Sequence, residues 1–368
     1  MNKTTWAITI GIILGILIFI GFTHKDKPQV NQPIKIAALL SLTGDYSSAG
    51  ENAQKAIQLA TKEINEKGGI GGRQVEIIYE DTAGDSKKTV STYQLVTSID
   101  HVEAIIGPLL QSELSAIIPL IDKDNIPTIA PDYISLQNRK NISNPILVWM
   151  DAETEANRMA QYVFSQGIRK VGVIGSLDNW ENIVSNTFAS EFTTLGGTVT
   201  DKEIVQPDVS DMKLPITKVL STNPQAIFLG TYYQFTNSTK ELHNLGYKGN
   251  TFGIEVDDYL AGQTSGWVSD LKFIAPDYYT NSFVTDFKNE YKIAPGLSAG
   301  EAYDATNILF SFLTKSDKKD DILSEMKKFK SHDGVSGQLQ IGADGRTTLP
   351  TALFDLKNGV ITRVKLLP

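Results

Sequence analysis

The chain has 368 residues, 41% of them hydrophobic and 21% charged, which is typical of a soluble globular protein with room for two domains. Its net charge of -8 and its lack of a basic run argue against nucleic-acid binding. The absence of cysteine excludes disulfides, thiolate metal sites and cysteine nucleophiles, and suits an exported protein without proving export.

An uncharged hydrophobic segment, residues 6–22, follows a short N-terminal tail of residues 1–5. It is at the short limit for a helix that crosses a bilayer, so it is either a retained membrane anchor or the core of a cleaved signal peptide. We favour the anchor, because residues 19–23 offer no good pair of small residues for signal peptidase. Residues 23–33 are polar, contain two prolines and would form the linker. We therefore expect an extracytoplasmic protein, anchored to the cell membrane or, if the segment is cleaved, secreted to the periplasm.

Three strand-and-helix units follow one another from residue 34 to residue 131. Ile34–Leu40 is a nearly continuous apolar run, which predicts a buried parallel strand that ends in a polar loop. Apolar residues at helical spacing from Ala53 to Ile64 predict a helix that stops at Gly68-Gly69. The next predicted elements are a strand over Val75–Tyr79, a helix from its cap Asp85 to Ile99, a strand over Ala104–Ile106, a helix from about Ser112 and a strand over Thr128–Ala130. Ligands of such sheets bind beyond the carboxyl ends of the strands.

The second half of the chain repeats this plan at a spacing of roughly 125 to 135 residues, about the size of one domain. A strand over Lys170–Ile174 ends in a polar loop, as the first strand does. A later helix ends at Gly196-Gly197, and two further strands cover Ala226–Gly230 and Thr251–Ile254. Two similar α/β lobes are the simplest interpretation, although any α/β protein shows some such echoes.

Signals for catalysis are weak. Residues 296–300 fit the nucleophile pattern Gly-x-Ser-x-Gly, but no strand runs into them, as a nucleophile elbow requires. A helix start is the better interpretation, with Ser298 as the N-cap and Glu301 closing a capping box. The four histidines are scattered without metal-ligand spacing. We therefore expect no enzyme, no metal site and no cofactor.

Several motifs of the first half together resemble a known family. They are Leu42-Thr43-Gly44, the helix end over residues 63–70, the aspartate loop of residues 81–85, Ile106-Gly107-Pro108, and residues 126–131. They resemble the branched-chain amino-acid (Leu/Ile/Val-type) periplasmic binding proteins of ABC transporters, and the similarity continues more weakly to about Leu367. The resemblance implies an α/β fold of the type I periplasmic binding protein class: two Rossmann-like lobes with parallel central sheets, joined by a three-strand hinge.

The resemblance also implies how the chain divides between the lobes. Lobe 1 is expected to comprise residues 34–150 and 277–334, and lobe 2 residues 151–276 and 335–364. Crossovers near Met150, Ala275 and Val335 are the hinge candidates. Because glycine and proline cluster only loosely there, these boundaries rest on the resemblance.

In lobe 2 the resemblance indicates residues for the ammonium half of an amino-acid site. Tyr232 matches the family's ligand-binding tyrosine, Glu255 matches its ammonium-binding glutamate, and Trp180 stands where an aromatic side chain covers the ligand. A carboxylate and aromatic faces are suited to an ammonium group. The competing interpretations are a solvated loop glutamate and aromatics that only pack between the lobes.

In lobe 1 the chain departs from the family's pattern. Where the family has a serine that binds the ligand carboxylate, this chain has Gln111, followed by Ser112. Tyr46, in the loop after the first strand, completes this side of the candidate site. The means of holding a carboxylate are therefore altered.

A second departure follows the fourth strand, where Asp132 replaces a small residue and Ser135 stands nearby. An ionised Asp132 in a closed cleft would repel a ligand carboxylate. We hypothesise that the ligand is an amine or amide without a free α-carboxylate, and a cation if Glu255, Asp257 and Asp258 share the same mouth. The alternative is that Asp132 points away or caps a helix.

Two classes of function fit these expectations. The first is an extracytoplasmic solute-binding protein of an ABC-type importer, which closes on a small amino acid, amide or amine and is recognised by permease subunits. The second is a ligand-sensing receptor domain that signals to a membrane or regulatory partner. The chain ends at residues 364–368 with neither a further membrane helix nor a signalling domain, which favours the first.

Overall fold

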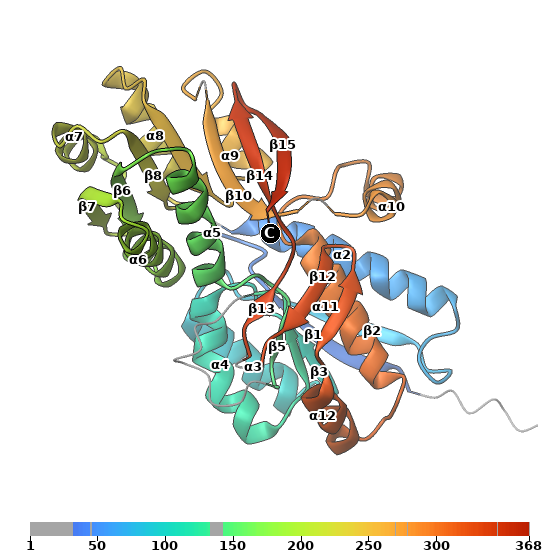
Figure 1. The fold of residues 1–368 in the computed structure, drawn as a ribbon. Coiled ribbons are helices and arrows are strands. Elements are labelled where there is room, and N and C mark those ends of the chain that lie inside the picture. The colour runs from blue at the N-terminus through green and yellow to red at the C-terminus, as the bar shows by residue number, and fades with distance from the viewer. Residues whose placement is uncertain are drawn as a thin grey trace, which may run out of the picture.

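The computed structural model describes residues 32–44, 46–132, 143–268, 270–277, 279–343 and 345–367. It contains two α/β lobes, each built on its own sheet (Figure 1). The hydrophobic segment 6–22 and Ser135 lie outside the described residues. Within the described part of the chain, no helix has the length and apolar character needed to span a membrane.

Lobe 1 is built on a five-stranded parallel sheet in the order β2-β1-β3-β4-β5. Its elements are β1 (Ile34–Leu40), α2 (Ser47–Glu66), β2 (Val75–Asp81), α3 (Ser86–Ser98), β3 (Ala104–Ile106), α4 (Gln111–Asp124), β4 (Thr128–Ala130) and β5 (Ile146–Leu147). In β1, Ile36 and Ala38 join the core that includes α2, whereas Ala37 and Leu39 join the core with α3 and α4. Both faces of β1 are covered, which is why it is almost wholly apolar.

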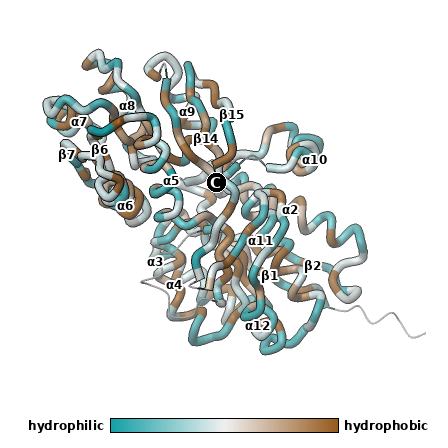
Figure 2. Tube along the Cα trace, viewed as in Figure 1, coloured by the Kyte–Doolittle hydropathy of each residue, from teal (hydrophilic) through white to brown (hydrophobic). Residues whose placement is uncertain are grey.

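Lobe 2 is built on a seven-stranded sheet in the order β15-β14-β10-β9-β8-β6-β7. Its elements are α5 (Ala152–Ser165), β6 (Lys170–Ser176), α6 (Asn179–Thr194), β7 (Thr198–Val205), α7 (Lys213–Ser221), β8 (Ala226–Gly230), α8 (Phe235–Asn244), β9 (Asn250–Ile254), α9 (Asp258–Gln263), β10 (Leu271–Pro276), β14 (Thr351–Lys357) and β15 (Val360–Leu367). Strands β6 to β10 are parallel, and the late pair β14 and β15 extends the sheet with antiparallel pairing. Figure 2 shows hydrophobic residues along the central strands of both lobes.

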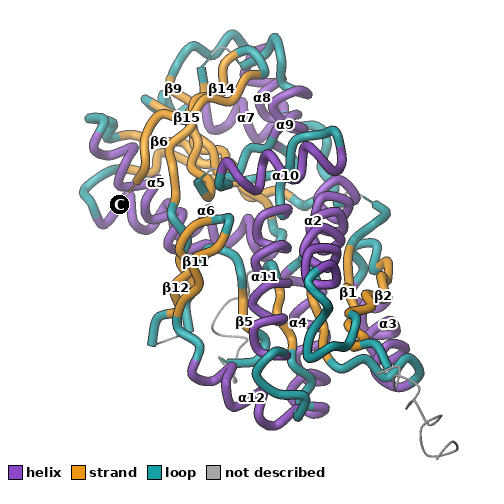
Figure 3. Tube along the Cα trace, turned by 90° about the vertical axis from the view of Figure 1, so that its right-hand side faces the viewer, coloured by secondary structure: helices purple, strands orange, loops and turns teal. Residues whose placement is uncertain are grey.

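Between β10 and β14 the chain returns to lobe 1. This segment contains α10 (Asn281–Tyr291), α11 (Ala299–Leu313), α12 (Lys319–Lys328) and a small antiparallel sheet of β11 (Ser331–Gly334), β12 (Gly337–Ile341) and β13 (Thr347–Thr348). Helix α11 packs along α2, and α10 also contacts α2 (Figure 3). The return places the start of α11 beside the gap between the lobes.

The crossover predicted near Val335 is wrong. Val335 lies in the turn of the β11–β12 hairpin, and the chain enters the lobe 2 sheet at Thr351 instead. Asp304 of α11 holds this turn in lobe 1 by accepting hydrogen bonds from the backbone N–H groups of Val335 at 2.8 Å and Ser336 at 2.9 Å. The chain leaves lobe 1 near Met150 and returns to it after Pro276. Of the three predicted crossovers, the third is therefore the one whose position differs.

Candidate functional site

Loops at the carboxyl ends of strands from both lobes face one another, and two contacts join them. The ring of Tyr46, after β1, meets the ring of Tyr233, after β8, edge to face at a centroid distance of 5.3 Å. The indole N–H of Trp149, between β5 and α5, donates to the carboxylate of Glu255, after β9, at 2.9 Å. The two lobes therefore touch at loops of the predicted binding region.

The loop that carries Tyr232 is fixed by a buried glutamate. Glu181, in the first turn of α6, accepts hydrogen bonds from the backbone N–H groups of Tyr232 at 2.6 Å and Tyr233 at 3.0 Å, and from the hydroxyl of Thr231 at 2.9 Å. The Tyr232 hydroxyl donates to Asp257, the N-cap of α9, at 3.0 Å. Tyr232 is thus held against the loop that follows Glu255.

Glu255 is buried and lies against two other side chains. It has a left-handed backbone, φ +49°, which is uncommon for a residue other than glycine, and its N–H donates to the carbonyl of Ile274 in β10 at 2.8 Å. Its carboxyl is within hydrogen-bond reach of the carboxyl of Glu155 in α5. Burial raises the pKa of Glu255 to about 7 and raises the pKa of Glu155 well above its ordinary value.

The contact between Glu155 and Glu255 has a chemical consequence. Glu155 is fully buried, and neither of its carboxyl oxygens accepts a hydrogen bond from an N–H or hydroxyl group of the described residues. Burial raises the pKa of both carboxyls, and two adjacent buried carboxylates would repel each other. The pair therefore holds at least one proton in the absence of a cation.

A cavity of about 430 Å³ lies beside Glu255, and both lobes line it. Lobe 2 contributes Glu255, the loop after it and apolar residues such as Phe273, whereas the returning segment contributes Tyr279, Leu297 and Glu301. The described residues that line it include no lysine, arginine or histidine. This cavity has the size of a small-molecule site and an acidic, apolar character.

The capping box predicted at the start of α11 is wrong. Ser298 is the N-cap as expected, but its side chain makes no capping hydrogen bond. Glu301 is instead buried, 1% exposed, and its carboxylate accepts from the Tyr279 hydroxyl at 2.9 Å. Burial raises the pKa of Glu301 to about 7. The Glu301 carboxylate therefore bonds to the Tyr279 hydroxyl in the cavity wall and not to the backbone at the start of α11.

The other predicted residues lie around the gap but not in this cavity. Gln111 is the first residue of α4 and is buried, and its Oε1 has no hydrogen-bond partner among the described residues. Ser112, next to it, is partly exposed, and Asp132, after β4, is buried. Trp180 is partly buried near the start of α6, where its backbone N–H donates to the Asp178 carboxylate at 3.1 Å. Of the ligand-binding residues predicted individually, Glu255 is the one in the described part of the chain that lines the cavity, and Asp257 and Asp258, which were expected at the same mouth, line it as well.

Sequence reasoning missed Trp149, Glu155, Glu301 and Tyr233. A signal for Glu155 was present, because it falls on the apolar face of α5 together with Ala152, Ala156 and Met159. A charged residue at a core position of a helix is rare without a specific role. The bond from Trp149 to Glu255 depends on how the lobes meet and has no local signature.

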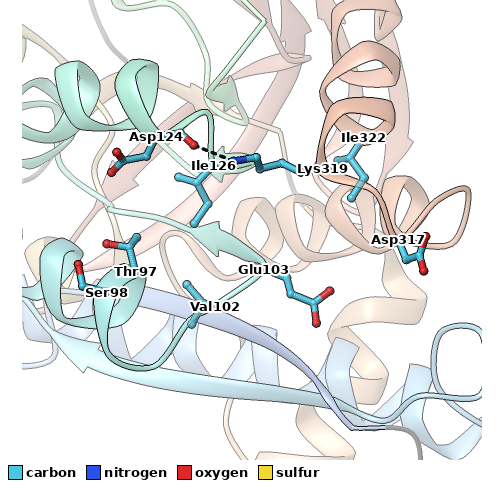
Figure 4. Close-up of a pocket in the computed structure, with 9 residues that line it drawn as sticks. All are labelled: Thr97, Ser98, Val102, Glu103, Asp124, Ile126, Asp317, Lys319 and Ile322. Carbon is cyan, nitrogen blue, oxygen red and sulfur yellow. Dashed lines mark hydrogen bonds between the residues drawn. The ribbon is translucent and has the colours of Figure 1, made fainter.

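Two further pockets lie away from the gap. The first, about 370 Å³ and lined by residues such as Glu103, Asp124 and Lys319, is shown in Figure 4. There the Lys319 ammonium donates to the Asp124 carbonyl at 3.0 Å. Residues at the start of β3 and the ends of α3 and α4 line it, so it is at the opposite edge of the sheet from the loops that bind ligands in such folds. The second, about 260 Å³, lies in lobe 2 around Tyr247.

Comparisons with known proteins agree with this architecture. The family model described as periplasmic binding protein matches residues 33–360. The Leu/Ile/Val-binding protein BraC3 of Rhizobium johnstonii is 21% identical and is aligned over 87% of this chain and 90% of its own, and the Leu/Ile/Val-binding protein homolog 3 of Brucella melitensis is 22% identical over 84% and 86%.

Solved structures share the fold. A leucine-binding protein from Thermotoga maritima has a TM-score of 0.82 at 23% identity, covering 91% of this chain and 98% of its own. A branched-chain amino-acid transporter substrate-binding protein from Streptococcus pneumoniae, in complex with isoleucine, has a TM-score of 0.81 at 20% identity, covering 91% and 99%. With the family match, these similarities show that the chain belongs to the branched-chain amino-acid group of type I periplasmic binding proteins, which are extracytoplasmic solute-binding proteins and not enzymes.

Proposed function

We propose that this protein serves an ABC-type importer and holds a small amino acid, amide or amine in the cleft between its lobes. The observation that carries the proposal is the carboxyl of Glu255, which is 9% exposed at the wall of an inter-lobe cavity. Its hydrogen-bond donor in the described part of the chain is the neutral indole of Trp149. A buried carboxylate is costly without a cation, and the ammonium of a ligand would supply one.

Residues of lobe 1 support a ligand that presents nitrogen. Gln111 stands where the family has its carboxylate-binding serine, and its buried Oε1 is an acceptor without a donor among the described residues. An N–H group of an amide or amine satisfies such an acceptor, whereas a carboxylate does not. Asp132, which is buried after β4, adds an acidic group on this side.

The mechanism is closure without chemistry. The contacts of Tyr46 with Tyr233 and of Trp149 with Glu255 join the lobes, so a ligand that bridges the same loops stabilises the closed form. Permease subunits would then recognise the closed form of the protein. We also propose that residues 6–22 anchor the protein outside the membrane, because they are uncharged and apolar.

Calorimetry with leucine, valine, their amides and simple polyamines tests the ligand class. We expect nitrogen-bearing ligands to bind, and Glu255→Gln and Tyr232→Ala each to weaken binding by about 100-fold, or about 2.7 kcal/mol. Tight leucine or valine binding that Asp132→Ala leaves unchanged would contradict a ligand without a carboxylate. Importer function is tested by adding ligand-loaded protein to a reconstituted permease and measuring ATP hydrolysis.

One relative keeps a sensor role open as a second candidate. The chemotactic signal transduction system substrate-binding protein BasB of Halobacterium salinarum is 32% identical over 32% of this chain and 29% of its own. If the protein is a sensor, loaded protein leaves permease ATPase activity unchanged and is captured instead by a signalling receptor.

A further inference from the structure

We propose that the solute is an organic cation with an apolar body and no carboxylate, and that its ammonium binds between the carboxyls of Glu255 and Glu301 with release of a proton. This inference rests on the proposed function and names the substrate class of the same site. The resemblance predicted Glu255, whereas Glu301 emerges from the geometry of the cavity.

The composition of the cavity carries the first step. Glu255 and Glu301 enter the wall from opposite lobes, one after β9 and the other in the first turn of α11. Phe273, Leu297 and Phe354 supply apolar surface between them. Since the described lining contains no basic side chain, a ligand carboxylate in this cavity would be buried among acids without a counter-charge.

The region beside Glu255 also contains buried acceptors that lack a hydrogen-bond donor. Glu155 is fully buried against Glu255, and both of its carboxyl oxygens lack a hydrogen-bond donor among the described residues. A protein rarely leaves several buried acceptors unsatisfied. An ammonium brings three N–H donors and a positive charge to a region that is short of both.

The surrounding charges do not neutralise the two carboxyls. On α5, Arg158 lies near Glu155 but donates to the Thr351 hydroxyl at 2.6 Å. On β15, Arg363 forms an ion pair with Asp277 at 2.5 and 2.8 Å. The remaining ionisable groups that face the two carboxyls or line the same cavity are acids or tyrosines: Asp151, Glu155, Tyr232, Asp257, Asp258, Tyr279 and Asp304.

Proton release follows from this balance. Burial raises the pKa of both Glu255 and Glu301 to about 7, so near neutral pH each carboxyl holds a proton part of the time. A bound ammonium favours the ionised forms, and the displaced protons pass to the solvent. Affinity is therefore expected to rise with pH up to about 8 and to level off above it.

Three probes with the same isobutyl group separate the possibilities: leucine, leucinamide and 3-methylbutan-1-amine. Calorimetry of the full chain at pH 7, in phosphate and in Tris, gives both the affinity and the number of protons released. We expect the amine to bind at least 10-fold tighter than leucine and to release a proton. Glu301→Gln, which keeps an acceptor for Tyr279, is expected to weaken amine binding at least 10-fold and to reduce the proton release. Glu103→Gln, at the remote pocket of Figure 4, is the matched control and should leave both unchanged.

The outcomes are distinct. Leucine binding tighter than the amine overturns this inference and leaves the solute-binding function intact. Amine binding without proton release, or equal affinity in wild type and Glu301→Gln, also overturns it. Failure of all three probes, and of the wider panel of amino acids, amides and polyamines, removes both proposals. If Glu301→Gln does not fold, the comparison of the three probes on the wild-type protein decides the matter.

Discussion

Two buried carboxyls of lobe 2, Glu181 and Glu155, differ in how they are hydrogen-bonded. Glu181 accepts from two backbone N–H groups and one hydroxyl, at 2.6 to 3.0 Å. Glu155, equally buried, accepts from no N–H or hydroxyl group of the described residues and instead lies against Glu255. Burial raises the pKa of both, so burial alone does not separate them.

The donors are what separate the two groups. A buried acid with a full set of donors belongs to the scaffold, since it fixes the loop that supplies them. A buried acid without donors destabilises the ligand-free protein. A ligand that supplies the missing donors removes this penalty, which is the behaviour expected of a binding site. By this reasoning Glu181 positions Tyr232, whereas Glu155, which lacks donors among the described residues, and its neighbour Glu255, which accepts from the neutral indole of Trp149, form the part of the site that a cation would stabilise.

The largest expected effect is on stability at Glu181. Glu181→Ala removes the acceptor of the Tyr232 and Tyr233 N–H groups, while the Thr231 hydroxyl keeps Gln234 as its partner, so we expect the free energy of unfolding to fall by about 4 kcal/mol. Glu155→Gln should change it by no more than about 1 kcal/mol, because the native carboxyl pair already carries a proton. Urea denaturation of the two variants measures the difference. Equal losses would abolish the distinction between the two groups.

The acid cluster should also make stability depend on pH. The folded-state pKa of Glu255 and of Glu301 is about 7, above the ordinary 4.5, so the folded protein binds protons that the unfolded chain releases. Stability of the ligand-free protein should therefore fall as pH rises from about 5 to about 8, by about 2.5 kcal/mol for each of the two carboxyls. The double variant Glu255→Gln/Glu301→Gln should have a flatter profile. A wild-type profile that is level or rises over this range would contradict these pKa values.

Lobe 1 offers a scaffold acid of smaller effect. Asp81 accepts from the N–H groups of Leu42 at 2.9 Å and Thr43 at 3.1 Å, and from the Lys88 ammonium at 2.9 Å. Although partial burial opposes its charge, these bonds hold the pKa of Asp81 well below its ordinary value. Asp81→Asn should cost about 1 kcal/mol at pH 7, with the cost declining as pH falls below about 4. A cost that is the same at pH 2 as at pH 7 would point to packing rather than charge.

The smallest effect is expected at the rim of the cavity, where Arg363 pairs with Asp277 at 2.5 and 2.8 Å. Both side chains are partly exposed, so Arg363→Lys should change stability by no more than about 0.5 kcal/mol. Thermal unfolding at low and high salt measures it. A change above about 2 kcal/mol would mean that Asp277 stabilises the fold in the way that Glu181 does.

Much of the fold was predictable from local pattern. The bounds of β1, β3 and β8 agree with the apolar runs, because strands buried on both faces leave no room for polar residues. The cap at Asp85 was predictable for the same kind of reason, since its carboxylate accepts from the N–H of Lys88 three residues later, at 2.7 Å.

What could not be predicted depends on contacts between distant residues. The turn at Val335 stays in lobe 1 because Asp304, about thirty residues earlier, accepts its N–H. The Glu301 carboxylate bonds to Tyr279, 22 residues earlier in the chain, instead of to the start of its own helix. The carboxyl of Glu255 meets Trp149 across 106 residues. Spacing along the sequence does not record which lobe a returning segment packs against.

The most direct measurement is a crystal structure of the protein with a ligand from the calorimetric panel. The account predicts a nitrogen atom of the ligand within hydrogen-bond distance of the Glu255 carboxylate, in an enclosed space with Tyr232 on the same side. A ligand bound with its carboxylate toward Gln111 and no nitrogen near Glu255, or one bound outside the gap between the lobes, would contradict it.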